Sequence, residues 1–112
     1  AIITASDGAV WFTENNAAAP KLGRLSSSGV LNEYPLTGAG SATGLTQDSQ
    51  GLFVVVDTAK NSVGRFDPIT LAYNEYPITT ANAGPEWVTV GPDGRVYVTE
   101  TTANQIGQFS YF

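Results

Sequence analysis

Three glycines recur at a constant spacing of 43 residues, and this periodicity limits the folds open to the chain more than any other feature. A repeat of about this length is typical of β-propeller blades, but also of some helical solenoids. Each glycine is followed two positions later by a largely apolar pentapeptide. The matching pieces of the three copies are Gly8 with Val10–Glu14, Gly51 with Phe53–Asp57, and Gly94 with Val96–Glu100.

The copies also share a second segment centred on glycine, and the first two copies end in Asn-Glu-Tyr-Pro. The third copy ends at Phe112, before this last element. We therefore predict part of one domain, built from repeats over about 1–37, 38–80 and 81–112, the last lacking its outer strand. The shared later segments are Leu22–Leu25, Asn32–Pro35, Val63–Phe66, Asn74–Pro77 and Ile106–Phe109.

The chemistry of the repeated segments favours strands over helices. The segments are short and rich in Val, Thr, Tyr, Phe and Trp, and Asp7-Gly8 and Asp93-Gly94 are typical of hairpin turns with positive φ at glycine. The sequence thus predicts an all-β segment of a β-propeller with four-stranded antiparallel blades, two complete and a third partial. In the second copy, the expected strands are about 44–46, 52–56, 62–66 and 72–76.

Burial is expected to differ between the second and fourth strands of each copy. Residues 53–56 are apolar on both faces, so neighbouring blades have to cover both faces. The fourth strand alternates more and ends at Pro35 or Pro77, which fits an outer edge. Trp11 is expected in the core. Open blade faces at the two ends of the chain are expected to carry Val10, Phe12, Val96 and Val98.

Composition excludes several classes of function. Five Lys and Arg against ten Asp and Glu give a formal charge of −5, so neither nucleic acid nor a membrane surface is expected as a partner. No apolar run approaches the roughly 18 residues of a membrane-spanning helix. The chain has no Cys and no His, hence no thiolate nucleophile and no imidazole base. Few Lys and many Ser, Thr, Ala and Asn residues favour an extracellular protein, with a cytoplasmic one as the alternative.

The third copy also carries a family resemblance. Its residues Pro85, Val88-Thr89, Asp93–Glu100 and Asn104–Gly107 resemble the blade signature of the virginiamycin B lyase, or streptogramin lyase, family. The resemblance covers nearly the whole chain and implies a seven-bladed propeller of about 300 residues. The chain would then supply only C-terminal blades. Further blades, from the rest of the same protein or from copies of this chain, are therefore the expected partners.

One acidic residue recurs at the end of the second strand in each copy, namely Glu14, Asp57 and Glu100. Radial symmetry would place these residues at equivalent positions. Carboxylate oxygens suit Mg²⁺ or Ca²⁺, and the family resemblance implies dependence on Mg²⁺. Glu100 and Glu14 are therefore the candidate metal ligands. The structural alternative is that these carboxylates accept backbone or Arg hydrogen bonds between blades.

The resemblance also implies a catalytic His directly after the proline that precedes an inner strand. Here Glu86 follows Pro85 at that place, so no catalytic residue is assigned. Glu86 and Trp87 are the candidate ligand-binding residues, with the indole able to stack on a ligand ring. Their structural alternatives are a solvated loop carboxylate and a packed indole.

Two further features need an assignment. Arg24 and Arg65 recur after the glycine of the third strand, where they could bind an anion but are expected to bridge blades through carboxylates. The first copy carries an insertion within 15–21, expected as an exposed loop of the kind that often holds recognition residues.

Three functions fit these observations. The first is a propeller module for binding or assembly, without the catalytic His in this segment and with a small molecule as a possible ligand. The second is a Mg²⁺-dependent lyase that opens a cyclic ester of the streptogramin B type. The third is a lactonase-like hydrolase with a carboxylate-bound cation. An inter-blade hydrogen bond to Glu100 would favour the first, and a bound metal would favour the other two.

Overall fold

A computed structural model describes residues 1–110, so the last two residues of the third repeat, Tyr111 and Phe112, lie outside the described residues. Within the described part, every regular element is a β-strand. The strands are β1 Ile2–Thr4, β2 Val10–Glu14, β3 Lys21–Leu25, β4 Leu31–Pro35, β5 Leu45–Gln47, β6 Phe53–Asp57, β7 Ser62–Phe66, β8 Tyr73–Pro77, β9 Pro85–Val90, β10 Val96–Glu100 and β11 Gln105–Phe109. The predicted strands of the second copy agree with β5–β8 to within one residue at each end.

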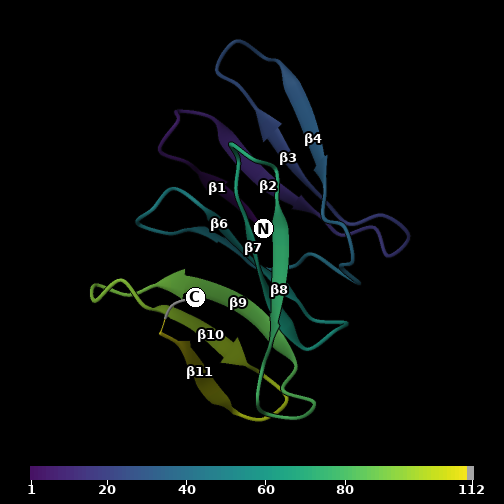
Figure 1. Ribbon diagram of the computed structural model, residues 1–112, viewed down its shortest axis with the longest axis vertical. Helices are drawn as coiled ribbons and strands as arrows, with labels where there is room; N and C mark the ends of the chain where they lie inside the picture. Colours follow the sequence, from purple (N-terminus) through teal and green to yellow (C-terminus); the bar gives the residue numbers. More distant parts are fainter. Residues whose placement is uncertain (111–112) are drawn as a thin grey trace.

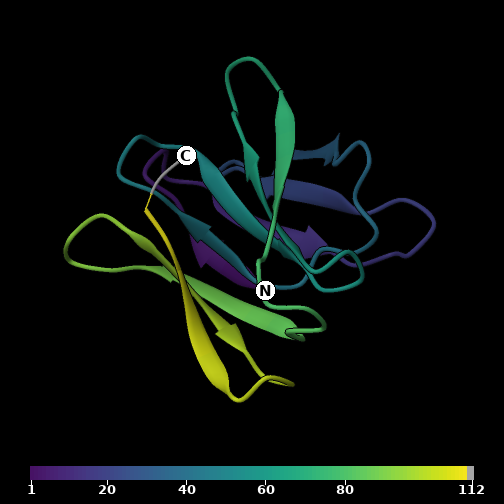
Figure 2. The ribbon, with the colours of Figure 1, turned by 60° about the horizontal axis from the view of Figure 1, so that its bottom comes forward.

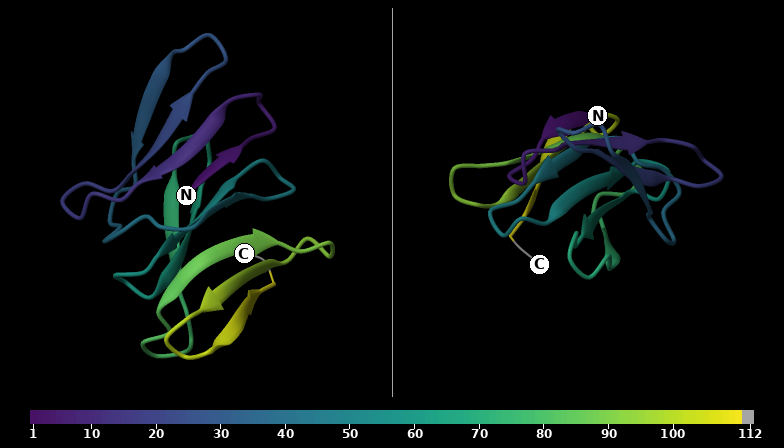
Figure 3. Two further views of the ribbon diagram at one scale, coloured as in Figure 1. Left: turned by 180° about the vertical axis from the view of Figure 1, so that it is seen from behind. Right: turned by 90° about the horizontal axis from the view of Figure 1, so that it is seen from above.

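The strands form three antiparallel sheets that follow one another along the longest axis of the molecule (Figures 1 and 3). In chain order, the sheets contain β1–β4, β5–β8 and β9–β11, and each strand pairs with its neighbours in sequence. The predicted all-β propeller segment, with two four-stranded blades and a partial third, is thus confirmed. No helix among residues 1–110 is long and apolar enough to cross a membrane.

The repeated glycines form the turns between the first and second strand of each sheet. Gly8, Gly51 and Gly94 have φ of 81°, 83° and 81°. Positive φ is unfavourable for residues with a Cβ, particularly for β-branched ones. The 43-residue spacing therefore reflects one turn that is used in the same way in all three sheets.

Aromatic rings fill the space between the first and second sheets. The Trp11 indole is 1% exposed and stacks on Phe53, with ring centroids 4.1 Å apart. The Tyr34 ring also stacks on this indole, with ring centroids 5.5 Å apart. The prediction that Trp11 belongs to the core is confirmed. The cluster of buried residues here is Ala5, Ala9, Trp11, Leu22, Leu36, Ala42, Leu45, Phe53, Val55 and Phe66.

Aliphatic side chains fill the space between the second and third sheets. All five residues of β6 are buried, because its two faces contact the sheets on either side. The expectation that Val96 and Val98 lie on an open face is wrong, since both face the second sheet and are at most 1% exposed. The open side of the third sheet instead carries Trp87 and Ile106, which are 62% and 71% exposed. The buried cluster is Val54, Val56, Val63, Ile78, Ala83, Val88, Val96 and Val98.

The outer strands have the exposure predicted for edges. In β4 every residue except Tyr34 is exposed, and in β8 exposed and half-buried positions are mixed. Pro35 and Pro77 end these strands. Figure 2 shows the β7–β8 hairpin projecting away from the third sheet. The inner strands β1, β5 and β9 lie at the opposite side of their sheets.

Candidate functional site

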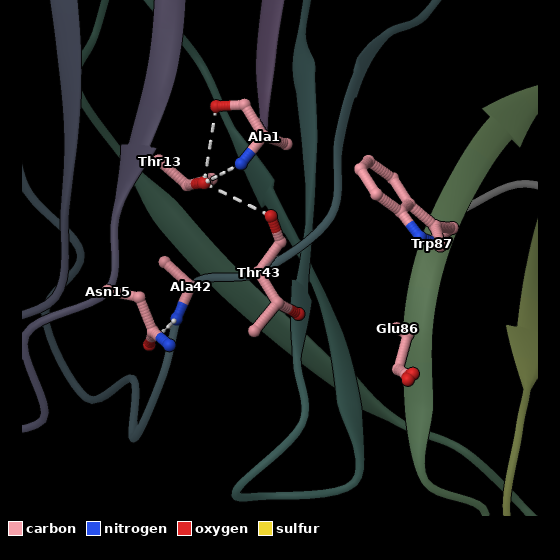
Figure 4. A pocket seen from close by; sticks show the side chains of 7 residues that line it. All are labelled: Ala1, Thr13, Asn15, Ala42, Thr43, Glu86 and Trp87. Atoms are coloured by element: carbon pink, nitrogen blue, oxygen red, sulfur yellow. Dashed lines mark hydrogen bonds between the residues drawn. The ribbon is translucent and has the colours of Figure 1, made fainter.

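A pocket of about 410 Å³ opens where the inner strands β5 and β9 begin and where β2 ends (Figure 4). It brings together short segments that lie far apart in the sequence and come from all three sheets. Its walls are formed by Ala1, Thr13, Asn15, Ala42, Thr43, Glu86 and Trp87.

One side-chain position links each sheet to the next at this end of the molecule. The Asn15 side-chain oxygen accepts a hydrogen bond from the Ala42 amide at 3.0 Å. Thr58 and Pro85 lie 43 residues further on, and there the Thr58 hydroxyl donates to the Pro85 carbonyl at 2.6 Å. Proline has no N–H to donate, so the linking side chain changes from an acceptor to a donor.

Threonine hydroxyls extend this link across the floor of the pocket. The Thr13 hydroxyl donates to the Thr43 carbonyl at 3.0 Å, as Figure 4 shows. The Thr43 hydroxyl lies 3.0 Å from that of Thr58. Because these residues belong to different sheets or to the segments that connect them, the hydrogen bonds fix the inner strands relative to one another.

A glycine allows the third sheet to approach the second at this point. A Cβ on Gly44 would lie 2.5 Å from the Glu86 carbonyl oxygen and 2.9 Å from a Val56 methyl group. Only a residue without a side chain leaves β9 that close to β5. Gly44 therefore brings the backbone of Glu86 and Trp87 to the wall of the pocket.

Glu86 and Trp87 are both exposed and lie side by side on β9, across the pocket from Thr43 (Figure 4). The Trp87 amide donates to the Thr99 hydroxyl at 3.0 Å, which holds this part of β9 on β10. The pocket thus offers an apolar ring, one carboxylate and several hydroxyl and amide groups. Such a mixture suits a ring-shaped organic ligand with polar substituents. The roles of Glu86 and Trp87 in ligand binding stay predictions.

The candidate metal ligands lie away from this pocket. Glu14 and Glu100 end the second strands of the first and third sheets, and neither lines the pocket. Glu100 is 3% exposed and accepts a hydrogen bond from the Gln105 amide nitrogen at 2.8 Å. Among residues 1–110, no three acidic side chains converge as a metal cluster. A Mg²⁺ ion bound by either carboxylate would need further oxygen ligands from elsewhere.

Carboxyl groups are paired in the first two sheets. A hydrogen bond shared with Glu33 raises the pKa of Glu14, and burial adds to the effect. In the second sheet, burial raises the pKa of Glu75 to about 7, and its hydrogen bond with Asp57 acts in the same direction.

Asp57 titrates in the opposite direction from Glu75. Burial alone would raise its pKa, but hydrogen bonds from Glu75, the Gly40 amide and the Ser41 hydroxyl outweigh burial and lower it. The Gly40 and Ser41 groups lie 2.8 and 2.9 Å from the Asp57 oxygens. Since Gly40 and Ser41 belong to the connection from the first sheet, this carboxylate also anchors one sheet to the next.

Each of the repeated arginines pairs with a carboxylate of its own sheet. Arg24 contacts Asp7 at 2.9 Å, and Arg65 contacts Asp48 at 3.3 Å. Each aspartate belongs to the turn before the second strand of the same sheet. A carboxylate partner was correctly expected, and these two partners lie within the blade because the third strand pairs alongside that turn.

The sequence reasoning missed the polar part of the pocket. Thr13 and Thr43 were not proposed as site residues, and Asn15 was included only in the exposed inserted loop, because their roles depend on how neighbouring sheets meet. The 43-residue spacing between Asn15 and Thr58 was the available signal, since both fall at the same point of consecutive repeats.

Comparisons with known proteins agree with this architecture. Residues 1–111 match the sequence profile of the Virginiamycin B lyase family. The chain is similar to virginiamycin B lyase from Staphylococcus aureus, with 28% identity and a TM-score of 0.78, over 98% of this chain and 40% of that one. A structure of a streptogramin B lyase shows 32% identity and a TM-score of 0.76, over 99% of this chain and 40% of that one. No curated protein sequence matches significantly.

A further similar structure is that of a catalytically inactive His-to-Ala variant of the Staphylococcus aureus lyase with quinupristin. It shares 28% identity with this chain at a TM-score of 0.79, over 98% of this chain and 40% of that one. The chain thus spans about 40% of the length of these similar structures.

Proposed function

Because the chain belongs to the virginiamycin B lyase family, we propose that it forms a ligand-binding part of a propeller wall and packs against further blades. The ligand is a small cyclic molecule held at the pocket of the inner strands. The observation that carries this proposal is the joint exposure of Trp87 and Glu86 at a pocket with a hydrogen-bonded floor.

The ligand class follows from the pocket and from a relative. The Staphylococcus aureus lyase variant was solved with quinupristin, and the exposed Trp87 ring offers a face on which a ligand ring can stack. Glu86 can accept hydrogen bonds from ligand amides or pair with a cationic substituent. A streptogramin B-type cyclic ester is therefore the first ligand to test.

Binding without ring opening is the form of this function that residues 1–112 support best. A His-to-Ala variant of the Staphylococcus aureus lyase is described as catalytically inactive. This chain has no His at all, and Glu86 is the titratable side chain that lines the pocket. A general base has to lie within hydrogen-bond reach of the proton that it removes, and an imidazole would have to come from outside this segment.

A Mg²⁺-dependent lyase, or a lactonase-like hydrolase, is the second candidate. It draws on the family membership and on the nearly buried Glu100 carboxylate. Since the chain spans about 40% of its similar structures, the missing base and metal ligands would come from the remainder of a larger propeller. Glu100 and Glu14 are the residues of this segment that we propose as ligands for Mg²⁺.

Tryptophan fluorescence tests the binding proposal directly. The chain has two Trp residues, and Trp11 is 1% exposed whereas Trp87 is 62% exposed. Titration with quinupristin is expected to change the emission of Trp87 in a saturable way. Trp87→Phe should abolish the optical signal, and calorimetry on that variant should show weaker binding. Glu86→Gln should weaken binding while leaving the fluorescence of the free protein unchanged. The absence of any saturable change with quinupristin would overturn the proposal.

A further inference from the structure

The inner strand of the third sheet contains a β-bulge at the wall of the pocket. The pairing of β9 with β10 shifts by one residue between Val98 and Glu100. As a result, Glu86 and Trp87 of β9 both lie opposite the single residue Thr99 of β10. Bulges of this kind redirect side chains and are frequent next to active sites.

The bulge explains why two neighbouring side chains face the pocket. Side chains of a regular strand alternate between its two faces. In β9, the buried residues Pro85 and Val88 instead enclose two consecutive exposed residues, Glu86 and Trp87. Both of the exposed residues line the pocket (Figure 4). In a regular strand they would point to opposite faces of the sheet, and only one of them would face a ligand here.

The second sheet has the same arrangement 43 residues earlier. The Thr43 amide donates to the Val56 carbonyl at 3.0 Å, and the Val56 amide donates to the Gly44 carbonyl at 2.9 Å. Thr43 and Gly44 therefore share one partner on the second strand, as their counterparts in β9 do.

The first sheet repeats part of this arrangement. Ala1 is the counterpart of Gly44 and Trp87, and Thr13 is the counterpart of Thr99. The Thr13 amide donates to the Ala1 carbonyl at 3.0 Å, which is the equivalent of one of the bonds in the second sheet. The pocket is thus lined by residues of this bulge from three consecutive sheets.

In these three sheets, a threonine hydroxyl holds the bulge where the bulge residue carries a side chain. The Trp87 amide donates to the Thr99 hydroxyl at 3.0 Å, and the amino nitrogen of Ala1 donates to the Thr13 hydroxyl at 2.8 Å. In the second sheet the bulge residue is glycine, and a valine lies opposite it. Trp87 is the large side chain among the three bulge residues, so its sheet has the most to orient.

We propose that Thr99 is a positioning residue of the pocket. Its hydroxyl fixes the bulge of β9, and the bulge holds the Trp87 ring and the Glu86 carboxylate toward a ligand. Because Trp87 is 62% exposed, packing restrains the ring little, and its direction depends on the backbone that carries it. This inference rests on the ligand-binding function proposed above, and it adds the residue that prepares the ligand-facing side chains before binding.

Fluorine NMR of the chain labelled with fluorotryptophan tests the positioning without any ligand. Trp11 and Trp87 give one signal each, and Trp87→Phe assigns them. Thr99→Val removes the hydroxyl and keeps the shape of the side chain, so the Trp87 signal should shift or broaden. The signal of Trp11, which is 1% exposed, should stay in place. Thr99→Ser retains the hydroxyl and should restore the Trp87 signal.

Amide hydrogen exchange separates a local effect from a general loss of stability. In Thr99→Val, the Trp87 amide loses its acceptor and should exchange about tenfold faster or more. The amide of Val54, in the buried central strand β6, should exchange at the rate of the unaltered chain. A merely structural role of Thr99 would accelerate both amides together.

Calorimetry with quinupristin connects the positioning to binding. Thr99→Val should weaken binding by about fivefold to tenfold, whereas Thr99→Ser should bind like the unaltered chain. Thr89→Val is the matched control, because Thr89 is an exposed residue of the same strand that does not line the pocket. It should leave the Trp87 signal and the affinity unchanged.

The inference and the proposed function fail in different ways. An unchanged Trp87 signal and exchange rate in Thr99→Val, equal losses in Thr99→Ser, or equal quinupristin affinity of Thr99→Val and the unaltered chain would each overturn the inference. If the unaltered chain does not bind quinupristin, the proposed function fails, whereas a displaced Trp87 signal that Thr99→Ser restores would still support the positioning role. If Thr99→Val does not fold, Thr99→Ala gives the same comparison.

Discussion

The carboxyl groups of Asp57 and Glu75 share a hydrogen bond at the boundary between the first two sheets. Their pKa values move apart, because burial raises that of Glu75 to about 7 while the hydrogen bonds received by Asp57 lower its own. Near neutral pH, Asp57 is ionised and Glu75 holds the proton for part of the time. One proton is therefore part of the packing between these sheets.

The stability of the chain should fall as the pH rises from about 4.5 to about 7 because of Glu75. In this window the folded state binds the Glu75 proton more tightly than the unfolded state, so a rise in pH favours unfolding. Partial exposure screens the effect, and we expect a loss on the order of 1 kcal/mol. Urea unfolding at pH 4.5, 6 and 8 measures it.

Replacement of the titrating group provides the control for this pH dependence. Glu75→Gln keeps a hydrogen-bond donor toward Asp57 at every pH, and its stability should be flatter across the same window. Glu86→Gln removes an exposed carboxyl group and should retain the decline of the unaltered chain. An equal slope in Glu75→Gln would contradict the assignment to Glu75.

Thr58→Val should destabilise the chain by about 1–2 kcal/mol, because the Pro85 carbonyl loses its donor while the shape of the side chain is kept. The Thr58 hydroxyl also contacts that of Thr43, so the substitution affects a contact within the second sheet as well as the link to the third. Chemical denaturation measures the change. Thr101→Val alters the exposed equivalent in the third sheet and should stay within about 0.5 kcal/mol of the unaltered chain. Equal effects of the two substitutions would argue against the inter-sheet link.

Gly94→Val should cost at least about 1 kcal/mol of stability. A Cβ at Gly94 would meet nothing within 4 Å, and φ is 81°, so the cost is conformational and not steric crowding. Gly94→Asn should cost less, since Asn tolerates positive φ better than β-branched residues do. Thermal melting compares the two variants, and an unchanged melting temperature in Gly94→Val would contradict the role of the turn.

The chain should associate instead of remaining a monomer of 11.8 kDa. The open side of the third sheet exposes Trp87 and Ile106, and repeat units need a neighbour to cover such a face. Light scattering is expected to show a larger mass or aggregation. Ile106→Lys should reduce association by about tenfold or more. Ile69→Lys, at a 90% exposed position between β7 and β8, should leave association unchanged.

With quinupristin and Mg²⁺, the purified chain should give no ring-opened product above the buffer background. The reason is Glu86 in the position where the family resemblance implies a His, in a chain that contains none. Mass spectrometry of the reaction mixture is the measurement, and addition of a chelator should change nothing. Product that forms with the chain and disappears with the chelator would favour the lyase function.

Local signals predicted much of this fold. The strands of the second sheet were predicted to within one residue. The signals were turn glycines, pentapeptides rich in β-branched and aromatic residues, and terminal prolines, each of which acts over a few neighbouring residues. The choice between the two faces of a strand was harder. Val96 and Tyr97 point to opposite faces of β10, and the sequence does not say which of these faces looks back toward the second sheet. That choice depends on the twist and stacking of whole sheets.

The site was predictable only where a single residue carried the signal. Glu86 and Trp87 were named from their place after Pro85, and both line the pocket, while their role in ligand binding stays a prediction. Asn15 was named only as part of an exposed inserted loop, and Thr43 was not named, because their hydrogen bonds to Ala42 and Thr13 depend on how neighbouring repeats meet. A sequence contains the partners of such bonds but not the geometry that brings them together.

The Phe12 ring of the second strand covers Gly23 in the first blade, whereas the Tyr73 ring of the fourth strand covers Gly64 in the second blade. The fourth strands of the two blades therefore cannot replace each other without a change in packing. A tyrosine in place of Leu31 would compete with Phe12 for one space, and a leucine in place of Tyr73 would leave a void over Gly64. Exchange of fourth strands between the first two blades is thus disfavoured in both directions. Each fourth strand therefore packs best on its own blade. This difference in packing disfavours misfolded states in which similar fourth strands pair with the wrong blade.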